Sequence, residues 1–313
     1  MSLTIGVDVG GTKIAAGVVS DSGEILAELR TESPADSVIE IEATIASLVA
    51  ELRLAHEVTA IGVGAAGFID NSRSRVLFSP NLAWKDLDLR SDLERLTGLP
   101  VVVENDANAA AWGEFTFGAG ADAEDLLLVT VGTGVGGGIV MDGELVRGGF
   151  GVAAEIGHIR LVRGGIECGC GLLGCLESYG SGTALVRQTQ EAAAADPSAA
   201  AALLEGAGGD VEAITGPMVT EAAQAGDPFA VARLVELGTW LGEGIASLAS
   251  VLDPGVVTLG GGVSAAGDLL LVPTRASFLA NLTGRGHRPE ADFRLARLGN
   301  KAGMIGAADL ARR

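Results

Sequence analysis

The fold of this chain is indicated by a stretch near its start, residues 3–31, with the sequence LTIGVDVGGTKIAAGVVSDSGEILAELRT. Apolar residues fill two segments on either side of the glycine pair at 10–11, and a turn at 21–23 leads into a third segment. A pair of glycines and the sequence Asp-Ser-Gly are both typical of tight turns between antiparallel strands. The stretch therefore predicts a meander of three strands.

A second stretch, residues 126–148, repeats this order with the sequence LLLVTVGTGVGGGIVMDGELVRG. Each copy has an apolar strand, a glycine-rich turn with a threonine, a second strand, and an aspartate-containing turn before a third strand. A repeated supersecondary unit indicates a duplicated architecture, although two glycine-turn hairpins could also resemble each other by chance. The repeat predicts two related domains.

Helix and strand patterns alternate in the rest of the chain. Apolar residues recur at helical spacing in 37–55 and 227–252. Short strand patterns that end in a glycine loop or a helix start occur at 60–70, 99–115 and 255–267. This alternation predicts an α/β fold with mostly parallel sheets and additional antiparallel meanders.

Length, composition and charge indicate the number of domains and argue against nucleic acid as a partner. The chain has 313 residues, of which 47 are glycine, and its formal net charge is -19. This length exceeds what one core usually supports, so we expect two domains. No cluster of Lys and Arg is present, which argues against nucleic acid as a partner. An anionic ligand would have to be held by backbone N–H groups and a divalent cation.

The sequence predicts neither export nor membrane insertion. It begins directly with a strand pattern, and the longest apolar region, 229–252, contains Arg233, Glu236 and Glu243. A membrane span carries few or no charges, so this region is predicted to be a core helix. The three cysteines form one tight cluster, which favours metal binding over disulfides and a cytoplasmic location.

The cysteine cluster predicts a structural zinc site. Cys168, Cys170 and Cys175 lie within eight residues, and His158 precedes the first of them by ten residues. Three thiolates and one imidazole are the donors of a closed tetrahedral zinc site. The alternative is a group of buried free thiols beside an unrelated histidine. With four protein ligands the zinc could not activate water, so we expect it to fix loop geometry.

Glycine-rich turns at 8–13 and 132–138 are candidate phosphate sites. In the first, two amide N–H groups can approach an oxyanion, and Asp8 can hold a water of hydrated Mg²⁺. The alternative is an ordinary hairpin turn. The second contains G-x-G-x-x-G, but a strand pattern follows where a dinucleotide-binding fold requires a helix. A second phosphate-binding turn is therefore favoured. The glycine run at 259–263 could lie flat against a base, or could only pack a strand on a helix.

Asn105 and Asp106 stand between a strand pattern and a helix pattern. Asp106 there could be a helix N-cap or a general base at the carboxyl end of a strand. Asn105 offers both a donor and an acceptor, which suits a sugar hydroxyl.

Together these motifs resemble the ROK family of bacterial sugar kinases, and within it the glucokinases, over essentially the whole chain. The segments that carry the resemblance are DVGGTK at 8–13, ENDANAAAWGE at 104–114, VGTGVGGG at 131–138, EIGHIRLVRGGIECGCGLLGCLES at 155–178 and LGGGV at 259–263. The glycine loop at 64–67, GAAG, lacks the proline that many members of the family carry.

The resemblance implies a ribonuclease-H-like fold of the actin/hexokinase type with two lobes that close on the sugar. Residues 1–104 plus 300–313 would form the small N-terminal α/β lobe, and residues 105–299 the large α/β lobe with the zinc site. It also implies that Asp106 takes the proton from the sugar 6-hydroxyl as that oxygen attacks the γ-phosphate of Mg-ATP. The implied activity is that of a glucokinase, a phosphotransferase that makes glucose 6-phosphate for glycolysis.

The resemblance assigns the other site residues in two groups. Sugar binding would fall to Asn105, Glu155, His158, Glu177 and Gly67. ATP binding would fall to Asp8, Gly10, Gly11, Thr12, Lys13, Thr133, Gly134, Gly261 and Gly262. His158 would bind zinc with one ring nitrogen and the sugar with the other, so that the zinc orients a substrate-binding imidazole.

Several alternatives stay open at this stage. The sugar could be N-acetylglucosamine, N-acetylmannosamine, fructose or allose, because specificity among hexoses depends on a few hydrogen bonds. Polyphosphate could replace ATP. A sugar-responsive repressor would need a DNA-binding domain ahead of the kinase-like core, and the net charge opposes DNA binding. The resemblance implies a homodimer or homotetramer, with ATP and glucose as ligands.

Overall fold

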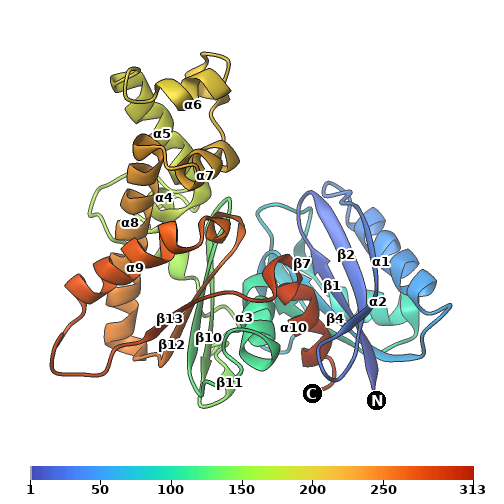
Figure 1. Cartoon of the computed structure of the whole chain (residues 1–313). Helices are drawn as coiled ribbons and strands as arrows, with labels where there is room; N and C mark the ends of the chain where they lie inside the picture. The colour runs from blue at the N-terminus through green and yellow to red at the C-terminus, as the bar shows by residue number, and fades with distance from the viewer. Residues whose placement is uncertain (1) are drawn as a thin grey trace. The chain divides into compact units, whose positions relative to one another are not determined.

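The computed structural model describes residues 2–313, and contacts within the chain divide it into two compact units (Figure 1). Unit 1 holds the chain up to Leu128, Gly138–Ala154 and Arg297–Arg313, and unit 2 holds Val129–Gly137 and Glu155–Ala296. These boundaries differ from those of the predicted lobes, because residues 105–128 and 138–154 group with unit 1. The assignment of two functional lobes stays a prediction.

Unit 1 contains a five-stranded sheet with the order β3-β2-β1-β4-β8. Its strands are β1 (Leu3–Val9), β2 (Lys13–Val19), β3 (Ile25–Glu32), β4 (Val58–Ala65) and β8 (Val101–Asn105). The first three are antiparallel neighbours, which confirms the predicted meander. β4 runs parallel to β1 and β8 parallel to β4.

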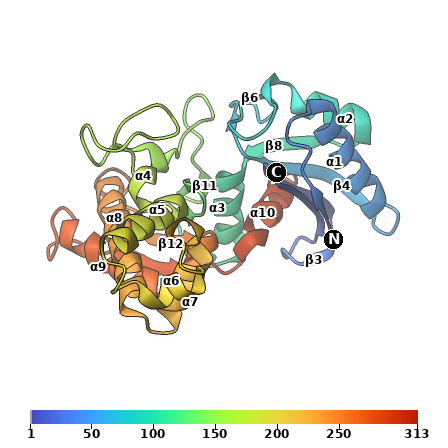
Figure 2. The ribbon, with the colours of Figure 1, turned by 90° about the horizontal axis from the view of Figure 1, so that it is seen from above.

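Helices cover both faces of this sheet (Figures 1 and 2). α1 (Val38–Leu52) and α2 (Leu89–Thr97) lie on one face, and α10 (Ala302–Leu310) lies on the other. Ile5, Val7 and Val9 belong to a fully buried cluster with residues of α1. Because side chains alternate along a strand, Gly6 and Asp8 point to the α10 face.

α10 is packed between the sheet and α3 (Asp106–Phe117) at very short range. A Cβ atom on Gly62 of β4 would collide with the Ala307 carbonyl oxygen, and one on Gly306 would collide with the Ala109 carbonyl oxygen. Glycine is therefore required at both positions by close backbone approach. This packing holds the starts of α3 and α10 beside the carboxyl end of β1.

A small antiparallel sheet with the order β5-β6-β7 completes unit 1. Its strands are β5 (Phe68–Ile69), β6 (Val76–Phe78) and β7 (Lys85–Leu87). They follow directly on the glycine loop at 64–67 and so anchor the position of Gly67.

The second five-stranded sheet has the order β11-β10-β9-β12-β13. Its strands are β9 (Leu126–Val131), β10 (Val135–Met141), β11 (Glu144–Leu145), β12 (Val256–Gly260) and β13 (Asp292–Leu295). β9, β10 and β11 are neighbours in chain order, which confirms the duplicated meander. A strand, β10, follows the glycine turn at 132–134, so the helix that a dinucleotide fingerprint needs is not there.

The other helices belong to unit 2. They are α4 (Glu177–Gly180), α5 (Gly182–Ala195), α6 (Ala201–Gly206), α7 (Gly216–Gln224), α8 (Pro228–Leu252) and α9 (Asp268–Asn281), with short 3-10 turns at Ile156–His158, Val211–Ala213 and Gly262–Ala266. α8 begins where predicted: Asp227 accepts a hydrogen bond from the Ala230 N–H at 2.7 Å. Within residues 2–313 no helix is long and apolar enough to cross a bilayer.

Candidate active site and metal centre

The candidate base, Asp106, stands at the junction of β8 and α3. The N-cap of α3 is Asn105, whose side-chain oxygen accepts the Asn108 N–H at 3.0 Å. The Asn105 amide also donates to the Gly67 carbonyl at 3.1 Å, which joins two predicted sugar-binding residues. Since Asn105 provides the cap, Asp106 is not needed for it. The Asp106 carboxylate accepts the Ala107 N–H at 2.9 Å.

Asp8 and Asp106 share a crowded space at the start of α10. A Cβ atom on Gly303 would lie 3.6 Å from Asp8 Oδ1 and 3.7 Å from the Asp106 carbonyl oxygen. Burial and the charge of Asp106 raise the pKa of Asp8 to about 6, and burial raises the pKa of Asp106. Two such carboxyl groups at a strand end are typical of functional sites, and a divalent cation there would relieve the cost of their charge.

A buried ion-pair network around Glu104 supports the junction of β8 and α3. Glu104 is 1% exposed and pairs with Arg147 at 2.7 Å and with Arg73 at 3.2 Å. Its second carboxylate oxygen accepts the Asn105 N–H at 3.0 Å. Arg147 also donates to the Asp70 carbonyl at 2.9 Å. The network therefore ties the backbone of Asn105 to two loops of unit 1.

The first predicted phosphate turn is a hairpin between β1 and β2. The Gly10 N–H donates to the Lys13 carbonyl at 3.0 Å, and Thr12 and Lys13 are exposed. Gly11 faces the Asn81 backbone so closely that a Cβ would lie 3.1 Å from its carbonyl oxygen. Because Gly11 has no side chain, the turn can lie against the loop after β6. The exposed side chains of Thr12 and Lys13 stay available to a ligand.

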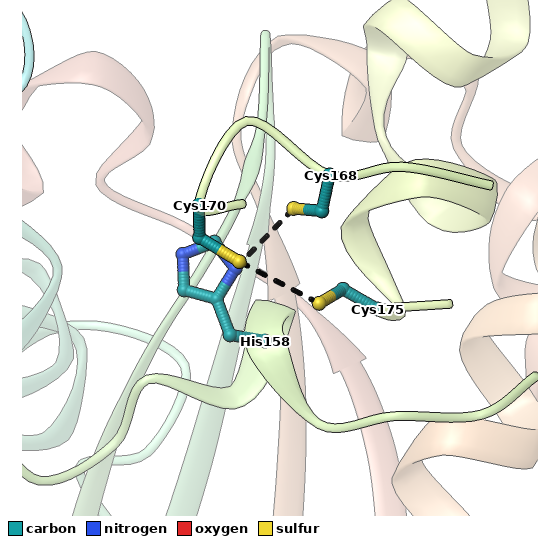
Figure 3. A group of neighbouring side chains, drawn as sticks. All are labelled: His158, Cys168, Cys170 and Cys175. Carbon is teal, nitrogen blue, oxygen red and sulfur yellow. Dashed lines mark hydrogen bonds between the residues drawn. The ribbon is translucent and has the colours of Figure 1, made fainter. Parts of the chain in front are cut away.

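The four predicted zinc ligands come together in unit 2 (Figure 3). One ligand atom from each of His158, Cys168, Cys170 and Cys175 lies within 4.8 Å of the others. Cys168 Sγ is 3.6 Å from His158 Nδ1, and Cys170 Sγ is 3.7 Å from Cys175 Sγ. Tetrahedral ligands around zinc stand roughly 3.8 Å apart for a Zn–S bond of about 2.3 Å. The donor set and its spacing therefore fit a structural zinc ion.

Of the sugar-binding candidates, His158 belongs to this cluster, and Glu155 and Glu177 flank it in the sequence. Glu155 is exposed and directly precedes the 3-10 turn that ends at His158, the turn in which Gly157 packs against the Val135 carbonyl. His158 presents Nδ1 to the thiols, so its Nε2 is on the opposite side of the ring. The Glu177 carboxylate accepts the Val135 N–H at 3.0 Å.

The glycine turns of unit 2 lie beside one another at the ends of β9 and β12. Gly261 has a positive φ of 83°, and a Cβ there would lie 2.5 Å from the Val131 carbonyl oxygen, so glycine is required. Gly262 has open space around its Cα. Thr133 and Gly134 form the turn after β9, in which the Gly132 N–H donates to the Gly134 carbonyl at 3.0 Å.

The predicted residues thus fall into two sets. Unit 1 carries Asp8, Gly10, Gly11, Thr12, Lys13, Gly67, Asn105 and Asp106, and unit 2 carries Thr133, Gly134, Glu155, His158, Cys168, Cys170, Cys175, Glu177, Gly261 and Gly262. Sequence reasoning missed Arg73, Arg147 and Gly303. Only Gly303 had a signal that could have drawn attention to it, because it is a glycine within the helical sequence pattern of residues 300–313.

The duplicated meanders with glycine turns at their strand ends are those of the ribonuclease-H-like, actin/hexokinase type of fold. The chain belongs to the ROK family, whose family model matches residues 4–313. The chain is 51% identical to a glucokinase of Streptomyces coelicolor over 312 residues, which is 100% of this chain and 98% of that protein.

A solved structure of a ROK family glucokinase is also similar to this chain. The chain is 52% identical to a ROK family glucokinase from Streptomyces griseus crystallised with glucose and AMPPNP, with a TM-score of 0.90 over 99% of each chain. A more distant relative is a putative xylose repressor of Caldicellulosiruptor, which is 36% identical over 69% of this chain and 53% of the repressor.

Proposed function

We propose that this chain is a glucokinase that transfers the γ-phosphoryl group of Mg-ATP to the 6-hydroxyl of glucose. The observation that carries the proposal is identity of about half of all residues, over the whole chain, to glucokinases that include one solved with glucose and an ATP analogue. The site geometry agrees, because the N-cap of α3 is Asn105 and the Asp106 carboxylate is not required for it.

In this reaction Asp106 accepts the proton of the sugar 6-hydroxyl while the new O6–P bond forms and the P–O bond to ADP breaks. The Asp106 carboxylate suits this role because burial raises its pKa above that of an ordinary aspartate. Asn105, through its bond to Gly67, holds the sugar-facing loop in place. Glu155, His158 and Glu177 would accept and donate hydrogen bonds to the other sugar hydroxyls.

The nucleotide would be held mainly by backbone amides, since the protein is strongly acidic. The turns at Gly10–Lys13 and Thr133–Gly134 would receive the phosphates, and Gly261 and Gly262 the adenosine. Mg²⁺ bound with the nucleotide would neutralise phosphate charge, and Asp8 is placed to hold one of its waters. Zinc on the Cys₃His cluster would orient the His158 ring.

The proposal extends to the setting of the enzyme. A cytoplasmic location suits both the ATP substrate and the free thiols. A homodimer or homotetramer is proposed on the family resemblance, and analytical ultracentrifugation would distinguish the two.

The test is glucose 6-phosphate formation from Mg-ATP by the wild type and by Asp106→Ala, with glucose affinity measured separately. We expect the variant to bind glucose and to lose turnover by at least about a hundredfold, the usual contribution of a general base. Retention of most activity would contradict the role of Asp106. A panel of N-acetylglucosamine, N-acetylmannosamine, fructose, allose and polyphosphate tests the substrate, and preference for another sugar or donor would replace glucose or ATP in the proposal.

A further inference from the structure

One segment of unit 2, Cys175–Thr183, begins at a ligand of the Cys₃His cluster and ends against the glycine turn at 132–134. Backbone hydrogen bonds within the segment define its conformation: the Ser178 N–H donates to the Cys175 carbonyl at 3.1 Å, and the Gly180 N–H to the Leu176 carbonyl at 2.8 Å. It passes through α4 and enters α5, where Ser181 provides the N-cap. Its two ends are therefore held in a defined relation.

The far end of the segment donates hydrogen bonds to two carbonyl groups of the turn, those of Gly132 and Thr133. The Gly182 N–H donates to the Gly132 carbonyl at 2.7 Å. Thr183 donates to the Thr133 carbonyl twice, from its hydroxyl at 2.7 Å and from its N–H at 3.4 Å. Gly182 has no room for a side chain, because a Cβ would lie 2.6 Å from the Gly132 carbonyl oxygen.

These bonds decide which way the amides of the turn point. In a trans peptide the C=O and N–H of one plane are directed to opposite sides. Turning the Gly132 carbonyl to Gly182 therefore turns the Thr133 N–H away from the segment, and turning the Thr133 carbonyl to Thr183 does the same for the Gly134 N–H. Two amides face outward while the carbonyls, which would repel an anion, face inward.

The near end of the segment holds the other side of the turn. Glu177 stands two residues after the ligand Cys175 and accepts the Val135 N–H at 3.0 Å. The same carboxylate fills the space beside Gly134, where a Cβ would collide with it. The turn is thus bounded by Glu177 on one side and by Gly182 and Thr183 on the other.

We infer that Cys175–Thr183 is the scaffold that orients the phosphate-binding amides of the 132–134 turn, with Thr183 as a positioning residue for the nucleotide. The inference rests on the proposed function, because the phosphates of ATP are the anion concerned. It gives the Cys₃His cluster a second task. Besides orienting His158 toward the sugar, the cluster anchors the segment on which nucleotide binding depends.

The first test compares Thr183→Val, which keeps the shape and removes the hydroxyl, with Thr183→Ser, which keeps the hydroxyl. The readouts are the dissociation constant of Mg-AMPPNP by calorimetry and the separate KM values for ATP and glucose. We expect Thr183→Val to weaken AMPPNP and raise the KM for ATP by about three- to tenfold, the effect of one lost hydrogen bond. The KM for glucose should change by less than about twofold, and Thr183→Ser should resemble the wild type.

The outcomes separate this inference from the proposed function. If the wild type neither binds AMPPNP nor phosphorylates glucose, the proposed function fails and takes the inference with it. If the wild type does both and Thr183→Val binds AMPPNP as tightly as the wild type, the inference alone is wrong. An equal loss for ATP and glucose would also overturn it, because that result indicates general damage to unit 2.

The second test addresses the cluster itself through Cys170→Ser, a change at the exposed thiol ligand. AMPPNP affinity is measured without any sugar present, on protein whose circular dichroism shows it to be folded. We expect weaker AMPPNP binding and faster amide hydrogen exchange at Val135, because the Glu177 contact loosens with the segment. Unchanged AMPPNP affinity and unchanged exchange at Val135 would show that the cluster does not support the phosphate turn. If the variant does not fold, zinc-depleted wild type takes its place and is measured by the same two readouts.

Discussion

Asp8, at the end of β1, shows how burial and a neighbouring carboxylate, that of Asp106 at the start of α3, change the chemistry of an aspartate. Asp8 is the residue whose pKa rises to about 6, through burial first and then through the charge of Asp106. A carboxylate with a raised pKa binds its proton more tightly in the folded protein than in the unfolded chain. Above pH 6 its charge therefore lowers the free energy of unfolding, and this cost disappears as the pH falls toward 4.

Asp8→Asn should accordingly raise the free energy of unfolding at pH 7.5 in the absence of Mg²⁺ and reduce its dependence on pH between about 4 and 6. Urea unfolding at a series of pH values measures both. Asp21→Asn, at an exposed aspartate in the turn between β2 and β3, is the matched control. Identical pH profiles for the wild type and Asp8→Asn would show that the Asp8 charge costs the fold nothing.

Arg147 supports the segment that carries the candidate base Asp106, because it pairs with Glu104 two positions before it. It is 9% exposed and pairs with Glu104, which is almost fully buried. Removing one partner leaves a buried carboxylate with less compensation, a change that costs about 3 kcal/mol or more. Arg147→Ala should therefore lower the free energy of urea unfolding by about that amount. Arg95→Ala, which breaks an exposed pair with Asp92, should cost less than about 1 kcal/mol. Equal losses for the two variants would mean that Glu104 finds other partners.

Among the elements, α10 is closely packed, because the sheet and α3 contact it from two sides. The helix propensity of alanine would favour Gly306→Ala by about 1 kcal/mol. The collision with the Ala109 carbonyl opposes this and should dominate, since backbone must move to make room.

We expect Gly306→Ala to lower the free energy of unfolding by about 2 kcal/mol or more. Gly149→Ala is the control, because Gly149 is exposed and a Cβ there would meet no atom within 4 Å. Thermal unfolding of both variants measures the difference. A Gly306→Ala protein as stable as the control would indicate that α10 can shift without loss.

The elements also differ in how well local sequence predicts them. α1 and α8 were predicted because their apolar spacing is regular, and the structure adds that Ser37 and Asp227 provide their N-caps. A helix is predicted after the glycine run at 259–263, but the bounds of α9 are not, since Pro273 interrupts its pattern. It is helical because it packs against α8, where a Cβ on Gly238 would lie 2.9 Å from the Pro273 ring. The strands β5, β6 and β7 are too short to give a pattern.

For the molecule as a whole, we expect the loss of zinc from the Cys₃His cluster to affect both the stability of the fold and the binding of substrate. Purified protein should contain about one Zn²⁺ per chain, and Cys168→Ser or chelation should lower both the melting temperature and the affinity for glucose. Metal analysis, thermal unfolding and glucose titration, repeated after zinc is restored, measure this. Active protein without zinc and with an unchanged melting temperature would contradict it.

The sequence by itself determined the duplicated meander, the α/β class, the four metal ligands and the candidate base, because each depends on a local pattern or on ligands close together in the chain. Only the tertiary structure decided what surrounds them. Arg147 reaches Glu104 from 43 positions away, and Thr183 reaches the Thr133 carbonyl from 50 positions away. No local pattern specifies such pairs, since a hydrogen bond between distant segments forms only when packing has brought their backbones together.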